Sequence, residues 1–296
     1  MSKWLVTGAS GMLGRDLTAV LAAEHDIDLM AASRTELDIT EPAAVRAAVA
    51  GRDVVVNTAA WTDVDGAEAD EAGALAVNGT GAANIAAACA ETGAVLLHVS
   101  TDYVFSGDAT APYPEDAPIA PVSAYGRSKA AGETAVRALL PDRGFVVRTA
   151  WLYGENGRNF VATILRAAAD RETLDVVNDA SGQPTWSFPL ARQLAALGRA
   201  AASGQAPPGA YHGTASGSTT WYGLARAAFE LSGLDPDRIR PVSSDHFPRP
   251  ARRPIFSVLG HAGWEAAGIP PLTGWRQMLA DALSRPSFHE ARRGAR

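Results

Sequence analysis

The stretch Lys3-Trp-Leu-Val-Thr-Gly-Ala-Ser-Gly-Met-Leu-Gly14 decides the fold of this chain. It begins as a short apolar run of strand length and continues into three glycines, each three residues after the last. Residues 16–23 then repeat apolar side chains with a helical period. A strand, a glycine-rich turn and a helix in this order are typical of a dinucleotide-binding unit. The spacing is G-x-x-G-x-x-G, and a plain glycine-rich turn is the alternative interpretation.

Each of the three glycines has its own role in such a turn. Gly8 permits the tight turn, Gly11 lets the backbone approach a pyrophosphate, and Gly14 lets the helix pack on its strand. The free N–H groups at the start of the helix favour an anion at this place. The motif therefore predicts a cofactor whose pyrophosphate lies on the helix N-terminus.

Further apolar runs continue the pattern through the first half of the chain. Residues 53–60, 94–100 and 145–150 have the length and composition of buried parallel strands. They predict an α/β fold with a Rossmann-like, doubly wound parallel sheet. Ligands of such sheets bind outside the carboxyl ends of the strands, and Thr101 and Asp102 follow one of these ends. We therefore expect both residues near a substrate.

The residues after the second strand, 27–32, bear on the choice of cofactor. An NAD-selective site usually places an acid there for the ribose 2′-hydroxyl. This chain has Ser33 and Arg34 instead, a hydroxyl and a guanidinium that suit a 2′-phosphate. The pattern favours NADPH, with NADH as the alternative. Glu36 is close by, so an exposed loop arginine is the competing interpretation.

Tyr125 and Lys129 form a Y-x-x-x-K motif. Residues four apart on a helix lie on one face, so both side chains can reach one ligand. Tyr125 could give a proton to a carbonyl oxygen, and the Lys129 ammonium would favour the phenolate and lower the tyrosine pKa. Alone, the motif is weak, because many such pairs are solvated surface pairs.

Composition limits the remaining classes of function. The chain has 296 residues, 47% of them hydrophobic and 20% charged, as in globular proteins of one large or two intimate domains. The net charge of −6 argues against nucleic acid. Cys89 is the single cysteine, and we interpret it as a packed thiol. With no signal peptide and no apolar run of about 18 residues, we expect a cytoplasmic protein without a membrane partner.

Taken together, the motifs resemble the extended short-chain dehydrogenases/reductases, and among them the dTDP-4-dehydrorhamnose reductases. The resemblance covers essentially the whole chain in order. It implies a nucleotide-binding domain of residues 1–150, to which residues 189–213 return. It also implies a smaller, interleaved substrate-binding lobe of residues 151–188 and 214–296. The matching segments are Thr7–Gly14, Asn57–Glu68, Ser100–Gly107, Tyr125–Glu133, Arg148–Gly154, Gly182–Thr185 and Arg253–Leu259.

Two related activities are disfavoured by single residues. Family members that dehydrate nucleotide sugars carry Asp-Glu after the active-site threonine, whereas this chain has Asp102 and Tyr103. Epimerising relatives use a cysteine and a histidine, and Cys89 lies in the wrong segment. The resemblance thus implies NADPH-dependent reduction of the C4 ketone of a dTDP-4-keto-6-deoxyhexose, foremost dTDP-4-dehydro-L-rhamnose to dTDP-L-rhamnose. The alternatives are a reductase for another deoxysugar of antibiotic biosynthesis and an NADP-binding regulatory subunit without turnover.

The resemblance also implies residue roles. Tyr125 is the acid, Lys129 shifts its pKa and holds the nicotinamide ribose, and Thr101 stabilises the developing alkoxide. Arg253 is a candidate for the substrate diphosphate, with an exposed surface arginine as the alternative. The substrate contacts that we expect are Thr101, Asp102, Tyr103, Trp151 and Arg253; a core tryptophan is the alternative for Trp151. The cofactor contacts that we expect are Gly8, Ser10, Gly11, Met12, Leu13, Gly14, Ser33, Arg34, Asp38, Ile39, Ala59, Ala60, Thr62, Tyr125 and Lys129.

Some reductases of this family dimerise around a magnesium ion held by carboxylates, which bears on assembly here. One ligand position falls on Asp16, and a second falls on Phe188, whose phenyl ring offers no oxygen. We therefore expect no metal, and a monomer or a metal-independent homodimer. We interpret Asp16 as a helix-start acid that complements the helix dipole.

Overall fold

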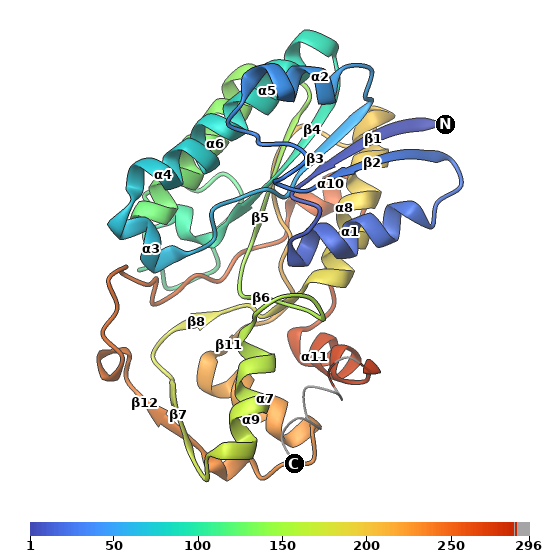
Figure 1. Cartoon of the computed structure of the whole chain (residues 1–296). Coiled ribbons are helices and arrows are strands. Elements are labelled where there is room, and N and C mark those ends of the chain that lie inside the picture. The colour runs from blue at the N-terminus through green and yellow to red at the C-terminus, as the bar shows by residue number, and fades with distance from the viewer. Residues whose placement is uncertain (287, 289–296) are drawn as a thin grey trace.

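The computed structural model of this chain describes residues 1–286 and 288. Its centre is a six-stranded sheet in the order β10-β5-β4-β3-β1-β2, and every neighbouring pair is parallel (Figure 1). The predicted Rossmann-like fold is thereby confirmed. The strands are β1 (Ser2–Thr7), β2 (Ile27–Ala32), β3 (Val54–Asn57), β4 (Val95–Thr101), β5 (Gly144–Thr149) and β10 (Gly209–His212).

Helices cover both faces of this sheet. One face packs on α1 (Met12–Ala22) and α8 (Ser187–Ala202), and the other on α2 (Pro42–Val49), α5 (Ala82–Thr92) and α6 (Ala124–Leu139). The strands are buried on both faces, which explains the unbroken valines of β3. The helix α2 begins at Pro42, where the fixed φ of proline suits a first turn. Between β3 and α5 lie α3 (Val64–Ala69), α4 (Glu71–Leu75) and the π-helix η1 (Ala76–Gly81).

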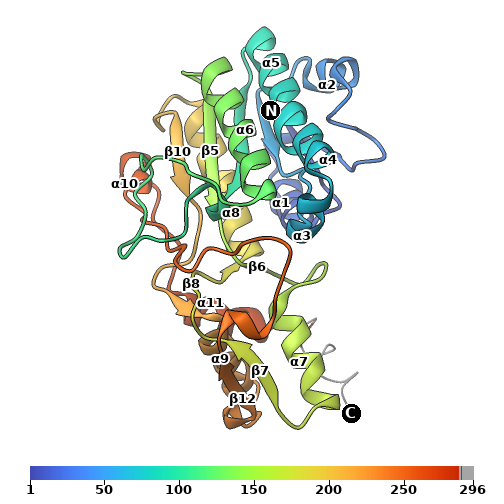
Figure 2. The ribbon, with the colours of Figure 1, turned by 90° about the vertical axis from the view of Figure 1, so that its left-hand side faces the viewer.

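A smaller lobe lies below the carboxyl end of the sheet (Figures 1 and 2). Its strands pair only two at a time, as β6 with β9, β8 with β11 and β7 with β12. Its core is a separate apolar cluster that contains residues of α7, α9 and α11. The elements are β6 (Leu152–Tyr153), α7 (Phe160–Asp170), β7 (Leu174–Val177), β8 (Ser181–Gly182), β9 (Thr185–Trp186), β11 (Thr219–Thr220), α9 (Trp221–Leu231), β12 (Ile239–Val242) and α11 (Trp275–Leu283).

The chain passes between the two lobes more than once. β10 joins the edge of the sheet beside β5, and α8 packs on α1. A second return, at α10 (Gly263–Ala266), is not evident from the sequence. Its Trp264 is fully buried, and the indole Nε1 donates a 2.8 Å hydrogen bond to the carbonyl of His212. Three short 3₁₀ turns complete the elements: η2 (Asp102–Val104), η3 (Pro236–Arg238) and η4 (Ser244–His246).

Two expectations outside the site can be compared with the structure. Cys89 is fully buried in α5, and burial raises the pKa of its thiol to about 12, which fits a packing role. Within the described residues, no helix has both the length and the apolar composition that a membrane span requires.

Candidate active site

A cavity of about 720 Å³ lies at the carboxyl ends of β1, β3, β4 and β5. Its volume is in the range of small-molecule and cofactor sites. All but two of the predicted site residues line it, and the exceptions are Ser33 and Arg253. The lining set comprises Gly8, Ser10, Gly11, Met12, Leu13, Gly14, Arg34, Asp38, Ile39, Ala59, Ala60, Thr62, Thr101, Asp102, Tyr103, Tyr125, Lys129 and Trp151.

The glycine turn is shaped for close backbone approach. Gly8 has φ +71°, and a Cβ there would lie 2.6 Å from backbone atoms of Ala59. A Cβ on Gly14 would collide with the Gly8 carbonyl oxygen. Gly11 is the N-cap of α1 and supplies no side-chain cap, so the first N–H groups of the helix are left for a ligand. These features fit the pyrophosphate of a dinucleotide.

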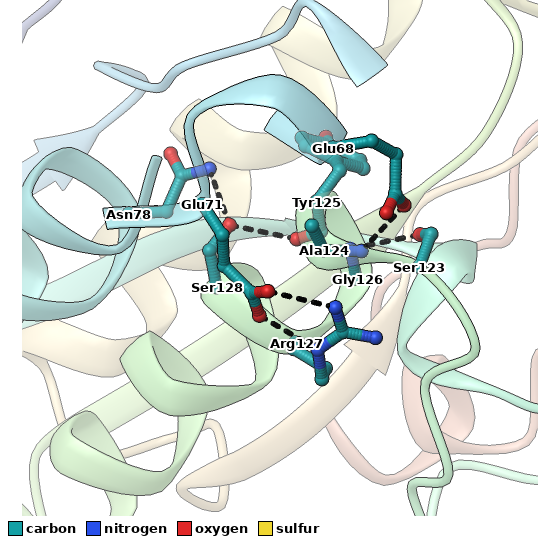
Figure 3. A network of polar contacts seen from close by, with 9 residues as sticks. All are labelled: Glu68, Glu71, Asn78, Ser123, Ala124, Tyr125, Gly126, Arg127 and Ser128. Atoms are coloured by element: carbon teal, nitrogen blue, oxygen red, sulfur yellow. Dashed lines mark hydrogen bonds and ion pairs between the residues drawn. The ribbon is translucent and has the colours of Figure 1, made fainter. Parts of the chain in front are cut away.

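Polar contacts fix the first turn of α6, which carries Tyr125 (Figure 3). The Ser123 hydroxyl caps the helix by accepting from the Gly126 N–H at 3.1 Å. The Ser128 hydroxyl donates to the Tyr125 carbonyl at 2.7 Å, and the Asn78 amide donates to Ser128 at 2.9 Å. The backbone of Tyr125 is therefore held from both the helix and the π-helix η1.

Two carboxylates from α3 and α4 reach the same turn. The Ala124 N–H donates to Glu68 at 2.8 Å, and Arg127 forms two hydrogen bonds of 2.7 and 2.9 Å with Glu71 (Figure 3). Glu68 thereby satisfies a backbone donor that the helix leaves free. These contacts fix the position of the first turn of α6, from which Tyr125 lines the cavity.

Lys129 lies one turn after Tyr125, and its side chain is fully buried. Its Nζ donates a 2.6 Å hydrogen bond to the Val99 carbonyl on β4. Burial lowers the pKa of this lysine to about 8, because a buried ammonium is poorly solvated. The ammonium group is thus anchored to the sheet beside Tyr125.

The expected lowering of the Tyr125 pKa is wrong. Burial raises this pKa above its usual value, and the Thr101 hydroxyl opposes the rise by hydrogen bonding. The nearby Asp102 and Tyr103 raise it further. The phenol therefore stays protonated at neutral pH, as a proton donor must.

Thr101 and Asp102 form a buried pair at the end of β4. The Thr101 hydroxyl donates to Asp102 Oδ1 at 3.0 Å and accepts from the Tyr103 N–H at 3.2 Å. Burial raises the pKa of Asp102 to about 6, against hydrogen bonds from Ser257 and Thr101 that lower it. The Tyr103 ring meets the Tyr125 ring edge-on, with centroids 5.6 Å apart.

Trp151 lies two residues beyond the end of β5 and is half-buried. Its ring stacks on Trp221 of the small lobe, with centroids 3.7 Å apart. Trp151 is therefore more than a core residue, because it lines the cavity as well.

The end of β2 is only partly as expected. Arg34 lines the cavity and is exposed. Ser33 does not line it, because its hydroxyl and N–H donate to Glu36 at 2.6 and 2.8 Å. Contact of Ser33 with a 2′-phosphate stays a prediction.

Arg253 lies behind Tyr103 instead of on the cavity wall. Its Nη2 donates to Asp65 at 2.8 Å, and its guanidinium carbon lies 5.9 Å from the centre of the Tyr103 ring. The Arg253 Nη1 is buried and has no hydrogen-bond partner among the described residues. Contact with a substrate diphosphate stays a prediction.

Our interpretation of Asp16 as a helix-start acid is wrong. The helix α1 already begins at Met12, so Asp16 lies beyond its first turn. One carboxylate oxygen accepts from the Ser187 hydroxyl, and the other accepts from the Asn156 amide at 3.3 Å. Phe188 packs against Trp186 and under the Arg285 guanidinium. No group of three or more His, Cys, Asp or Glu side chains in the described part of the chain is arranged to hold a metal.

Several cavity residues were missed by sequence reasoning. Arg158 lines the cavity from the loop after β6, and Ser100 and Thr149 bring buried hydroxyls without partners in the described residues. Ser100 and Thr149 lie at the carboxyl ends of β4 and β5, and this position at a strand end could have predicted that they line the cavity. For Arg158 there was no such signal, because no sequence pattern places the loop of residues 154–158 beside the glycine turn.

Comparison with known proteins agrees with this geometry. The family model described as the RmlD substrate binding domain matches residues 2–287. The chain is 54% identical over 283 residues to a dTDP-4-dehydrorhamnose reductase of Streptomyces griseus, covering 95% of this chain and 93% of the relative. It is 50% identical over 283 residues to a dTDP-4-keto-6-deoxy-D-glucose reductase of Streptomyces niveus, covering 95% and 96%.

A solved structure gives the same picture. The dTDP-4-dehydrorhamnose reductase of Bacillus anthracis strain Ames, crystallised in complex with NADP, superimposes with a TM-score of 0.89 at 35% identity. The match covers 96% of this chain and 99% of that chain.

Proposed function

This chain belongs to the dTDP-4-dehydrorhamnose reductase family, and from that premise we propose that it is an NADPH-dependent oxidoreductase. It reduces the C4 ketone of a dTDP-4-keto-6-deoxyhexose, foremost dTDP-4-dehydro-L-rhamnose, to the corresponding alcohol. The observation that carries the proposal is the placement of Tyr125, Lys129 and Thr101 on the wall of the same cavity as the glycine turn.

The cofactor supplies a hydride to the carbonyl carbon when it is bound. The chain supplies the rest of the chemistry. Tyr125 donates its phenolic proton to the carbonyl oxygen, for which its raised pKa keeps it in the acid form. The Thr101 hydroxyl lines the cavity and can turn its one hydrogen from Asp102 to the same oxygen as negative charge develops there. Lys129 then balances the charge of the tyrosinate that remains.

Binding is divided between the two lobes in this proposal. Residues 1–150, with 189–213, hold NADPH, with its 2′-phosphate near Arg34 and its pyrophosphate on the turn at Gly11. The hexose lies between this lobe and the small lobe of residues 151–188 and 214–296, of which 287 and 289–296 lie outside the described part. Asp102, Tyr103 and Trp151 contact the hexose.

The direct test is NADPH oxidation by the purified protein with dTDP-4-dehydro-L-rhamnose as substrate. We expect turnover that depends on the ketose and a product that is the 4-hydroxy sugar by NMR. NADPH binding without turnover of any dTDP-4-keto-6-deoxyhexose would instead favour the regulatory-subunit alternative.

A second substrate is supported by the name of the relative from Streptomyces niveus, a dTDP-4-keto-6-deoxy-D-glucose reductase. The same assay with that ketose distinguishes between the two candidate substrates. A kcat/KM at least tenfold higher for dTDP-4-keto-6-deoxy-D-glucose would assign the chain to the second candidate.

We also propose that the protein is a monomer or a homodimer that needs no metal. Supporting this, Asp16 is already bonded to Ser187 and Asn156, and Phe188 offers no oxygen. Light scattering should give the same mass with EDTA and with excess magnesium. A dimer that dissociates on chelation and returns with magnesium would show the proposal to be wrong.

A further inference from the structure

Trp151 has an unusual backbone conformation. Its φ is +46°, and it is the only non-glycine residue with a positive φ in the described part of the chain. A bulky side chain in the left-handed region costs free energy and persists only where neighbouring contacts over-determine it. The residue lies two positions past β5, whose last residue Thr149 pairs with Thr101. The strained residue is therefore next to the reacting centre.

Two elements of the small lobe hold the Trp151 ring. Trp221, the first residue of α9, stacks on it at 3.7 Å between centroids with an interplanar angle of 11°. Gly182 of β8 also contacts it, because a Cβ on Gly182 would lie 2.5 Å from two carbons of the indole. Both contacts come from the β8–β11 strand pair and the residue that follows it. Thr219 of β11 pairs with Gly182 of β8, and Trp221 comes two residues after Thr219.

Trp221 is itself fixed from two sides. The Thr220 hydroxyl caps α9 by accepting from the Gly223 N–H at 3.0 Å, which sets the direction of the first turn. The Phe160 ring at the start of α7 packs on Trp221 at 4.7 Å, tilted by 59°. The support for Trp151 is thus built into the small-lobe core and does not line the cavity.

We propose that Trp221 is a positioning residue, which together with Gly182 holds Trp151 in its left-handed conformation against the hexose of the substrate. This inference rests on the proposed function, because it takes the ligand beside Trp151 to be a dTDP-hexose. Trp221 acts through Trp151 and needs no contact with substrate. The ring of Trp151 offers an apolar face, which suits the C–H side of a deoxysugar.

The test compares Trp221→Ala, Trp221→Phe and Gly182→Ala. In Trp221→Ala the support is lost, and in Gly182→Ala the new methyl displaces the indole. We expect both to raise KM for the ketose about five- to tenfold, with kcat less affected and Kd for NADPH unchanged. Trp221→Phe keeps an aromatic face and should restore most of the lost affinity. Phe160→Leu is the matched control, because leucine keeps an apolar side chain packed on Trp221 and leaves the stack of the two indoles in place, so its KM should stay within about twofold.

Two readouts do not require turnover. Stacked indoles give a coupled pair of bands in far-ultraviolet circular dichroism, which should be lost in both Trp221 variants and kept in Phe160→Leu. Calorimetric titration with dTDP-L-rhamnose and with dTDP distinguishes the part of the ligand involved. Trp221→Ala should weaken binding of the sugar nucleotide about fivefold or more and leave dTDP unchanged.

Either of two results would overturn the inference. If Trp221→Ala weakens the binding of dTDP and of dTDP-L-rhamnose equally, the indole stack acts on the nucleotide and not on the hexose. If the affinity for both ligands is unchanged, Trp221 has no positioning role. If the wild-type protein binds dTDP-L-rhamnose and the variants behave as expected but no ketose is reduced, the proposed function fails while the positioning role stands.

Discussion

The two lobes of this molecule differ in the strand pairing and the ion pairs that stabilise each of them internally. The larger lobe has six parallel strands of four to seven residues, and its Arg148–Glu133 ion pair is fully buried at 2.8 Å. The small lobe pairs its strands two at a time, and its Arg276–Glu230 ion pair, also formed by one arginine and one glutamate, is half-exposed. Tyr125, Lys129 and Thr101 all come from the larger lobe, whereas Trp151 depends on the small one. The proton-donating residues are therefore built on the continuous parallel sheet, whereas the proposed sugar contact of Trp151 depends on the lobe with only two-stranded pairs.

The two ion pairs provide the largest test of this difference. Arg148→Met leaves the Glu133 carboxylate buried without a partner and should lower the free energy of unfolding by about 3–5 kcal/mol. Arg276→Met removes an exposed pair and should cost about 0–1 kcal/mol. Urea unfolding of both variants measures the two effects. Similar losses would show that the lobes do not differ in this way.

Tyr125→Phe separates chemistry from binding within the larger lobe. Only the proton donor is lost, so kcat should fall by about 10²-fold or more. The Kd for NADPH should be that of the wild type, because the glycine turn and Lys129 are untouched. Wild-type kcat in this variant would refute the assignment of Tyr125 as the acid.

Asp102 gives the stability of the larger lobe a pH dependence of its own. Its pKa is raised to about 6 by burial, so the folded protein binds this proton more tightly than the unfolded chain does. As pH rises from 4 to 7 the Asp102 contribution should lower the free energy of unfolding by about 2 kcal/mol. Asp102→Asn removes this dependence. Unfolding of both proteins across this range should show their stability difference shift in favour of the variant, and a constant difference would contradict the burial effect.

Arg34→Ala tests the cofactor end of the larger lobe, where the expected effect is modest. A charge-assisted contact with the 2′-phosphate is worth about 1.5–3 kcal/mol, and NADH has no such phosphate. Calorimetry should therefore show a weaker affinity for NADPH and little change for NADH. Equal losses for both cofactors would mean that Arg34 does not read the phosphate.

The contrast between the lobes also marks what the sequence could predict. The runs at 53–60 and 94–100 are apolar because both faces of the sheet are covered, so their strands were evident. The two-residue strands β8 and β11 have no such pattern, because tertiary contacts decide them.

The site divides in the same way. Glycine spacing and strand ends predicted most of the cavity wall of the larger lobe. The Trp151–Trp221 stack joins residues that are 70 positions apart, and no local pattern reports it. The Tyr125 pKa was misjudged for a related reason, since the burial that raises it comes from tertiary packing that no local pattern reports.

The central claim is that this cavity transfers a hydride from NADPH to C4 of a dTDP-4-keto-6-deoxyhexose. The most direct measurement uses NADPH deuterated at C4 of the nicotinamide, separately at each face, with dTDP-4-dehydro-L-rhamnose. We predict that one of the two labelled cofactors transfers its deuterium to C4 of the hexose, as seen by NMR and mass spectrometry of the product. A reduced product without deuterium at C4 from either cofactor, or no reduced product at all, would contradict the account.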